Sequence, residues 1–396
     1  MSGIRTRSNG KRGSRNHQVG GAYKHRVSGP EVVPIFAVMR ILLISAANSI
    51  HTVRWANAFV ERGWEIHLVS QHPPITGLSS NVVMHRMPHW GGLGYLLNGP
   101  RLARLVRHLL PDVVNAHYAT GYGTLARWCT GFPLVLNVWG SDVFAFPEKS
   151  FLHRKWLLRN LRSADHLVST SGFMAQRTAS LSAKLPPLTV VPFGVDTLMF
   201  SPASERSNTG PCVIGTVKSL APIYGIDVLI RAFAILVEQG QENVRLRIVG
   251  DGPDKADLVQ LAHTLGVAEQ VDFVGALAHA RVPEELRSMD IFVALSVSES
   301  FGVAIIEASA CGLPVVVSNA GGLTEVVQHD TTGFVVPQAD PEAAAARLKE
   351  LIASRELRQR MGKAGRAFVE ANFTWGSCVD RQLEVFQQVI DDRRRA

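Results

Sequence analysis

The chain has 396 residues, of which 46% are hydrophobic and 19% charged, a composition typical of a globular protein with room for two or three domains. Its formal net charge is +8, but most of that charge precedes Met39, which argues against specific nucleic-acid binding by the remainder. No apolar stretch reaches the ~20 residues that a membrane-spanning helix needs. The cysteines form no C-x-x-C pair, so we expect a cytoplasmic protein with reduced thiols and no zinc site.

Residues 1–38 are predicted to be a disordered basic tail, because they are rich in Gly, Ser, Asn and Arg and lack an apolar period. The tail could bind an anionic polymer, although an upstream extension without a folded role fits it better. Its basic residues and the apolar run Val32 to Ala47 imitate a secretory signal, but Pro34 and Arg40 interrupt that run. We therefore expect folding and activity to be independent of the residues before Met39.

Residues 39–200 predict a first α/β domain. Arg40 to Ala46 and Glu65 to Ser70 have the pattern of strands on either side of a helix from His51 to Arg62, which is a βαβ opening. Ligands of open α/β sheets bind at the carboxyl ends of strands. His51 therefore either faces a cleft or only begins the helix.

Polar side chains follow two later strands of this block. Asp112 to Ala116 leads into His117, and Pro133 to Val138 is followed shortly by Asp142. Because the carboxyl ends of parallel strands share one edge of a sheet, His117 and Asp142 are candidate catalytic residues in the same cleft. A histidine after a strand is more often structural than catalytic, and that alternative stays open for His117.

Two basic helices are predicted in the same domain. One helix is predicted from Lys149 to Arg162, with Lys and Arg side chains around an apolar stripe. The other is indicated by three arginines at i, i+3 spacing, namely Arg101, Arg104 and Arg107. A solvated helix face explains both patterns most simply. Contact with anionic lipid is the alternative.

Residues 201–211 have the composition of a linker, and residues 212–373 form a second block of alternating strands and helices. This block begins with a strand from Cys212 to Val217, a loop that contains Lys218, and a helix from Ile226 to Glu238. The blocks are nearly equal in size. The predicted architecture is therefore two doubly wound, Rossmann-like α/β domains that face an interdomain cleft.

The stretch Ser296 to Gly322 has the pattern strand, loop, helix, strand. Its helix is predicted to begin at about Gly302, with Ser298 or Ser300 as the capping side chain. Gly312 stands where a left-handed residue ends a helix. This stretch holds the main candidate site.

Glu299 lies in the loop before that helix and Glu307 in its second turn. The N–H groups of Gly302, Val303 and Ala304 at a helix start suit a phosphate. A diphosphate there would leave a ribose diol within reach of Glu307 and a sugar within reach of Glu299. Glu307 stands among apolar residues, so its charge needs a partner. The alternative is that both are ordinary solvated acids.

These residues resemble a known family. Glu299 and Glu307, followed by Gly312, Pro314, Gly321, Gly322 and Glu325, resemble the retaining glycosyltransferases of family 4, also described as glycosyl transferases group 1, which have the GT-B fold. Further similar segments follow the order of the family, namely VPFGVDTLMFSP (Val191 to Pro202), LRIVGDGP (Leu246 to Pro253) and VDFVG (Val271 to Gly275). The resemblance extends from about Met39 to the C-terminus. It implies that the helix in residues 374–396 returns to the first domain.

The resemblance also implies roles in donor binding. The Gly250 and Gly252 turn, with Gly275, would line the base side of a nucleotide, and Lys218 would meet the leaving diphosphate. Relatives usually carry two basic residues here, and this chain keeps one. In many relatives the position of Trp139 is a histidine that contacts the transferred sugar.

The expected activity is therefore retaining transfer of a sugar from a nucleoside diphosphate sugar, in the synthesis of a glycan, glycolipid or cell-envelope polysaccharide. We expect no cofactor and no metal, since no Asp-x-Asp occurs in the chain. The acceptor is unknown, with a lipid-linked molecule as one candidate, and the expected location is the cytoplasm, with peripheral contact at the inner face of the membrane. Two alternatives stay open, namely a catalytically silent sugar-nucleotide-binding subunit and another enzyme on this fold, such as a sugar-nucleotide epimerase.

Overall fold

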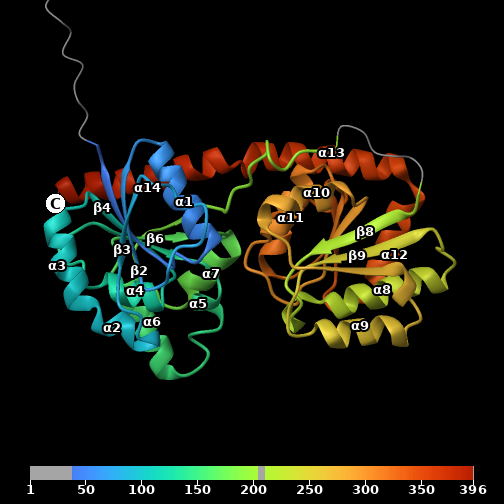
Figure 1. The fold of residues 1–396 in the computed structure, drawn as a ribbon, viewed down its shortest axis with the longest axis horizontal. Helices are drawn as coiled ribbons and strands as arrows, with labels where there is room; N and C mark the ends of the chain where they lie inside the picture. The colour runs from blue at the N-terminus through green and yellow to red at the C-terminus, as the bar shows by residue number, and fades with distance from the viewer. Residues whose placement is uncertain (1–37, 204–209, 396) are drawn as a thin grey trace, which may run out of the picture. The chain divides into compact units, whose positions relative to one another are not determined.

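The computed structural model describes residues 38–203 and 210–395 (Figure 1). Residues 1–37 of the predicted basic tail and residues 204–209 of the predicted linker lie outside the described residues. The described chain contains two parallel β-sheets with helices on their faces. Among the described residues, no helix has both the length and the apolar composition needed to cross a bilayer.

The elements alternate along the chain. The strands are β1 (Arg40–Ile44), β2 (Glu65–Ser70), β3 (Val82–Arg86), β4 (Val113–His117), β5 (Leu134–Val138), β6 (His166–Ser169), β7 (Leu188–Val190), β8 (Cys212–Val217), β9 (Val244–Val249), β10 (Val271–Gly275), β11 (Ile291–Ala294), β12 (Val315–Ser318) and β13 (Gly333–Val336). The helices are α1 (Ile50–Glu61), α2 (Gly94–Leu97), α3 (Gly99–Leu109), α4 (Gly121–Ala126), α5 (Ser141–Phe144), α6 (Phe151–Leu161), α7 (Gly172–Ser180), α8 (Ile226–Glu238), α9 (Lys255–Thr264), α10 (Val282–Arg287), α11 (Val303–Ala310), α12 (Pro341–Ala353), α13 (Arg355–Asn372) and α14 (Trp375–Arg395). Short 3-10 turns are η1 (Gly91–Leu93), η2 (Pro222–Tyr224), η3 (Ala268–Gln270), η4 (His279–Arg281) and η5 (Gly321–Glu325).

Both sheets are doubly wound. The first has the order β3-β2-β1-β4-β5-β6-β7 and the second the order β10-β9-β8-β11-β12-β13, and the strand pairs are parallel. The direction of winding reverses between β1 and β4 in the first sheet and between β8 and β11 in the second. Ligands of such sheets bind outside the carboxyl ends of the strands at this reversal. The prediction of two Rossmann-like domains is confirmed.

The central strands are buried on both faces, which is why they have near-continuous runs of Val, Ile and Leu. Such runs allowed β2, β8 and α8 to be predicted with the bounds that the structure shows. The basic helix predicted from Lys149 begins instead at Phe151, because the Ser150 side chain accepts a hydrogen bond from the His153 N–H and so caps the helix there.

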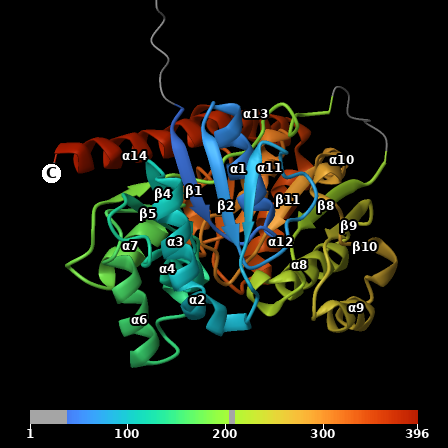
Figure 2. The same ribbon diagram turned by 60° about the vertical axis from the view of Figure 1, so that its left-hand side comes forward.

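The last helix, α14, packs on the first domain. It contacts α1, β4 and β5, and the Asn137 side chain donates to Gln382 Oε1 at 3.0 Å. Figures 1 and 2 both show α14 running along the first domain after α13. At the crossing, Val195 accepts from the Trp375 N–H at 2.9 Å, and a Cβ added at Gly194 would lie 2.6 Å from Trp375 Cα. A side chain at Gly194 would therefore separate the two chain segments that join the domains.

Direct hydrogen bonds also join the domains, between the segment that follows β6 and the segments that follow β11 and β12. The Ser171 hydroxyl donates to the Ser300 carbonyl at 2.5 Å. The Glu325 carboxylate accepts from the N–H groups of Gly172, at 2.8 Å, and Phe173. A carboxylate from the second domain therefore interacts with the positive end of α7 in the first domain.

Candidate active site

A cavity of about 570 Å³ lies between the carboxyl ends of the central strands of the two sheets. Sites for small molecules usually measure ~300 to 1,000 Å³. Of the predicted site residues, the cavity is lined by Lys218, Gly250, Glu299, Gly302, Val303, Ala304 and Glu307. The stretch that was singled out in the sequence therefore forms one wall of this cavity between the domains.

Helix α11 begins at the cavity without a capping side chain. The expected cap by Ser298 or Ser300 is wrong, because Gly302 occupies the N-cap position with a φ of 104°. Residues other than glycine rarely adopt this φ, and a Cβ added at Gly302 would lie 3.0 Å from side-chain atoms of Ile305 and Leu323. The first N–H groups of a helix have no partner within it. This uncapped start therefore offers hydrogen-bond donors to a ligand in the cavity.

Lys218 and Glu299 form an ion pair at the same wall. Lys218 Nζ donates to Glu299 Oε2, and the two side chains are 15% and 16% exposed. Nζ also lies 4.8 Å from the ring centroid of Tyr224. Without a ligand, each charge neutralises the other. An anion that enters the cavity would compete for Lys218, and a hydroxyl donor would compete for Glu299.

Glu307 is 5% exposed and has a partner. His279 Nε2 lies 2.9 Å from Glu307 Oε1, so the expectation that this charge needs a partner is confirmed. Arg54 interacts with the same carboxylate: burial lowers the pKa of Arg54, and the charges of Glu307 and Asp196 raise it by less. The second oxygen of Glu307 remains available to a ligand that can donate two hydrogen bonds.

The glycines after β9 allow close approach of two loops. A Cβ at Gly250, whose φ is 141°, would lie 1.8 Å from the carbonyl oxygen of Lys218, and one at Gly252 would lie 2.2 Å from that of Leu220. The Gly275 carbonyl accepts from the Gly250 N–H at 2.9 Å. Gly250 lines the cavity, whereas Gly252 and Gly275 do not. Gly252 therefore packs its backbone against Leu220, in the loop that follows Lys218, while Gly250 packs against Lys218 itself.

His117 is the last residue of β4 and Asp142 follows β5, so both lie at strand ends as expected, but they do not line the cavity. His117 is 1% exposed; its Nδ1 lies 3.1 Å from Ser45 Oγ and its ring centroid 4.5 Å from that of Trp139. Asp142 is 0% exposed and accepts from the Ala119 N–H at 2.8 Å. Burial raises the pKa of Asp142. Both side chains are therefore placed to hold strand ends together rather than to contact a ligand in the cavity.

Aromatic and basic residues complete the cavity, and His51 is among them, so of its two sequence alternatives the one that faces a cleft is confirmed. Trp139, Phe193 and His51 form one wall, in which His51 stacks on Phe193 with ring centroids 4.5 Å apart. Arg54 lies one helical turn after His51, so the i, i+3 spacing on α1 could have indicated it. Tyr118 lines the cavity with a φ of 76°, a conformation that is costly for a non-glycine residue and is often kept at functional sites.

Stability should depend on pH through the buried histidines. Burial lowers the pKa of His117 to about 3 and that of His51 to about 4. Below pH ~6.5 the unfolded chain binds protons that the folded chain does not, so their contribution is complete above this pH and is lost as the pH falls. As the pH falls from ~7 to ~5, each histidine should lower the free energy of unfolding by about 2 kcal/mol. In urea unfolding, the His117→Gln variant should therefore lose about 2 kcal/mol less unfolding free energy over this pH range than the parent protein loses. An unchanged dependence on pH would contradict the buried neutral state.

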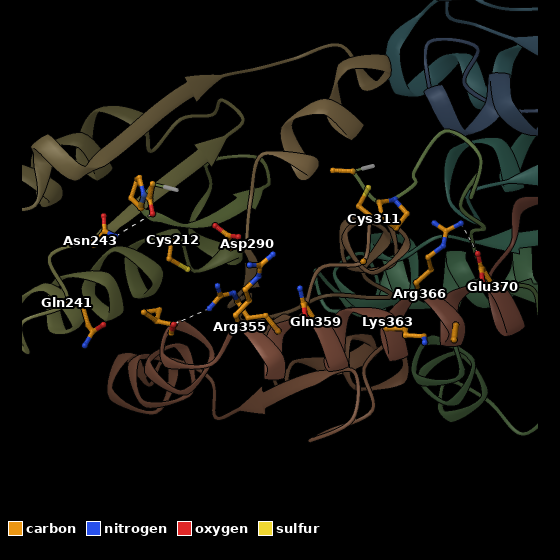
Figure 3. A pocket seen from close by; sticks show the side chains of 18 residues that line it. Cys212, Gln241, Asn243, Asp290, Cys311, Arg355, Gln359, Lys363, Arg366 and Glu370 are labelled. Atoms are coloured by element: carbon orange, nitrogen blue, oxygen red, sulfur yellow. Dashed lines mark hydrogen bonds and ion pairs between the residues drawn. The ribbon is translucent and has the colours of Figure 1, made fainter. Parts of the chain in front are cut away.

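A larger hollow, of about 820 Å³, lies elsewhere on the second domain, beside α13 (Figure 3). It is bordered by Ala203 and Gly210, which flank the undescribed segment. Two of its cations have protein partners, since Arg358 donates to the Leu351 carbonyl and Arg366 pairs with Glu370. None of the predicted site residues lines it. We therefore place the candidate site in the smaller cavity between the domains.

Comparison with known proteins shows which protein families the chain is similar to. The sequence profile described as glycosyl transferases group 1 matches residues 200–368, and the profile described as glycosyl transferase 4-like matches residues 40–171. The fold and the two matches define a glycosyltransferase with GT-B architecture. The two matches confirm the resemblance to family 4 of these enzymes, the glycosyl transferases group 1, that the sequence predicted.

Three relatives illustrate the similarity. N-acetyl-alpha-D-glucosaminyl L-malate synthase of Bacillus anthracis is 24% identical over 353 residues, which cover 84% of this chain and 91% of that protein. A GDP-mannose-dependent alpha-(1-6)-phosphatidylinositol monomannoside mannosyltransferase of Mycobacterium tuberculosis is 33% identical over 236 residues, covering 55% of this chain and 61% of that protein. The structure of the Anabaena protein HepE in complex with UDP-glucose has a TM-score of 0.74 at 20% identity, covering 88% of this chain and 100% of that one.

Proposed function

We propose that this protein is a retaining glycosyltransferase that moves a sugar from a nucleoside diphosphate sugar to a hydroxyl acceptor, in the synthesis of a glycan, glycolipid or cell-envelope polysaccharide. The observation that carries the proposal is the joint position of Lys218, Glu299, Glu307 and the uncapped start of α11 around one cavity. The resemblance to the family supports use of a nucleotide sugar. A structural neighbour with UDP-glucose supports such a donor in this fold.

The proposed orientation of the donor follows from the charges. The diphosphate lies at the N–H groups at the start of α11 and displaces Glu299 from Lys218, which then neutralises phosphate. The ribose diol shares two hydrogen bonds with the carboxylate of Glu307, while the sugar hydroxyls donate to Glu299. The base extends toward Ala276, which follows β10 and lines the cavity.

In the proposed chemistry, the bond between the sugar C1 and the phosphate oxygen breaks while the acceptor oxygen bonds to C1 on the same face. The leaving phosphate takes the acceptor's proton. Positive charge on the sugar and negative charge on the diphosphate develop together, and Lys218 with the start of α11 stabilises the latter. Among the carboxylates of the cavity, Glu299 pairs with Lys218, Glu307 with His279, and Asp251 accepts from the Gly252 N–H. The front-face route requires none of them as a nucleophile.

A panel of radiolabelled UDP-, GDP-, ADP- and dTDP-sugars tests this proposal, with each donor incubated with and without a chelator. We expect transfer or slow donor hydrolysis with at least one donor, an anomeric configuration that is retained in NMR spectra of the first product, and activity that survives chelation. We infer metal independence because Lys218 and helix N–H groups can meet the diphosphate charge. Inversion at C1 would overturn the retaining mechanism. Binding of a donor without transfer or hydrolysis would favour the silent subunit.

We further propose that the protein works in the cytoplasm at the inner face of the membrane, with a lipid-linked acceptor as the first candidate. The phosphatidylinositol mannoside named for the mycobacterial relative supports that class of acceptor. The surface described below supports the membrane contact.

A further inference from the structure

An exposed apolar patch lies on the first domain, over α2, the end of α4 and the first turns of α6. Figures 1 and 2 both show α2, α4 and α6 together in this domain. The Phe151 and Leu152 side chains are 77% and 73% exposed, far more than apolar side chains usually are. Leu96, Trp128 and Trp156 continue the patch, at 41%, 43% and 42% exposure. Adjoining hollows of about 620 and 560 Å³ between these side chains share Arg127, Lys155 and Arg159.

Trp156 shows how the patch is held in place. Its Nε1 donates to Thr124 Oγ1 at 2.7 Å, so the polar atom of the indole points into the protein while the ring is half-exposed. The α6 helix is fixed beneath it, because Asn160 donates to Thr124 Oγ1 at 2.8 Å and to the Ala119 carbonyl at 2.9 Å. The exposed rings and aliphatic side chains therefore stand on a rigid helix and not on a loose loop.

Cations surround the apolar patch without acidic partners. Arg127, Arg154, Lys155 and Arg159 line the two hollows, whose linings contain no Asp or Glu. These four form no ion pair with another described residue; Arg154 donates only to a carbonyl, that of Leu181. Burial and the positive charge of Arg159 lower the pKa of Arg127. Like charges are thus held together on this surface, and an anion there would relieve their repulsion.

The nearest acids along the chain cannot supply that anion. Glu148 pairs with Arg177, and Asp142 is fully buried. Asp165 accepts from the Leu134 N–H at 2.8 Å and lies 4.0 Å from Arg393. The ligand must therefore come from outside this domain. It must offer several negative charges around an apolar interior that accepts Phe151 and Leu152. An anionic lipid bilayer has this layout, with charged head groups above acyl chains. A nucleic acid would satisfy the cations but would leave the leucines exposed.

We propose that this surface docks the protein on an anionic lipid bilayer. The surface consists of the apolar side chains Leu96, Trp128, Phe151, Leu152 and Trp156 and the cations Arg127, Arg154, Lys155 and Arg159. Phe151 and Leu152 enter the boundary between head groups and acyl chains, and the cations bind the head groups. The proposal of membrane docking is argued from this surface and does not depend on the transfer reaction. The further conclusion that the acceptor is linked to a lipid rests on the proposed function.

Co-sedimentation of the full chain with vesicles tests the docking. Phosphatidylcholine vesicles with about one third phosphatidylserine should bind the parent protein at low salt, and added salt or neutral vesicles should abolish binding. Each cation near such a surface contributes roughly fivefold, so Lys155→Glu with Arg159→Glu should lower the partition coefficient at least ~25-fold. Phe151→Ser with Leu152→Ser should lower it by about 10-fold.

Matched variants separate docking from general charge and from the undescribed basic N-terminus. Arg360→Glu with Lys363→Glu makes the same charge change on α13 and should bind vesicles like the parent. Leu198→Ser, at a side chain that is 90% exposed, controls for lost apolar surface. Nucleoside diphosphate binding should be equal in all variants, so a failure of vesicle binding would leave the proposed transferase intact. Equal vesicle binding by the parent and the Lys155/Arg159 variant, equal binding to neutral vesicles, or a dimer that this variant dissociates would each overturn the proposal.

Discussion

Replacement of Glu299 by glutamine should lower kcat about 100-fold, while KM for the donor rises by much less. Glu299 lies beside Lys218 at the start of α11, where the sugar and phosphate part in the proposed orientation. Its hydrogen bonds to the sugar matter most as positive charge develops there, so their loss raises the barrier more than it weakens donor binding. Steady-state kinetics with the best donor of the panel measures both constants.

Glu284→Gln is the matched control for this change. It removes the same charge from a side chain of the second domain that is 67% exposed and does not line the cavity. Its kinetics should equal those of the parent, and both variants should keep the parental Tm. If Glu299→Gln raised KM and left kcat unchanged, Glu299 would contact a part of the donor that does not react, and the proposed contact with the departing sugar would be wrong.

Replacement of Glu307 by glutamine should weaken donor binding by ~1.5 to 3 kcal/mol, or roughly 10- to 150-fold. The variant keeps the shape and one acceptor, but it loses the charge that strengthens two hydrogen bonds from a ribose diol. The His279 contact at 2.9 Å uses one carboxylate oxygen, so the ribose competes for a side chain that is already held in position. Titration calorimetry with the intact donor measures the change.

His279 offers a control within the same contact. His279→Asn removes the imidazole partner and leaves the Glu307 carboxylate, so donor affinity should fall by less than in Glu307→Gln if the carboxylate itself holds the ribose. An equal loss in both variants would show that the pair acts only as a structural unit of the cavity wall.

The fold was predictable because local and long-range signals agree. Apolar runs such as those of β8 and β12 can be buried only between two layers of helices. Gly312 ends its helix with a φ of 73°, as its position after the apolar pattern indicated. These are short-range properties that residue type and spacing specify directly.

The details of the site depended on contacts that spacing does not specify. A serine before a helix predicts a cap, but Leu323 and Ile305 crowd the residue at the start of α11, so glycine takes that position and no side chain caps it. Strand-end positions identified His117 and Asp142, yet the ring of Trp139 lies over His117 and backbone N–H groups satisfy Asp142. His279, which contacts Glu307, is 28 residues away in the chain. Its role required the folded structure.

The most direct test of the proposed donor orientation is calorimetric binding of a free nucleoside diphosphate, which has a ribose and phosphates but no sugar. UDP, GDP and ADP are titrated into the parent, and the tightest binder is then titrated into Glu299→Gln and Glu307→Gln. The proposed orientation predicts weaker binding by roughly 10- to 150-fold in the Glu307 variant and nearly parental binding in the Glu299 variant. Parental binding in both folded variants, or an equal loss in both, would contradict it.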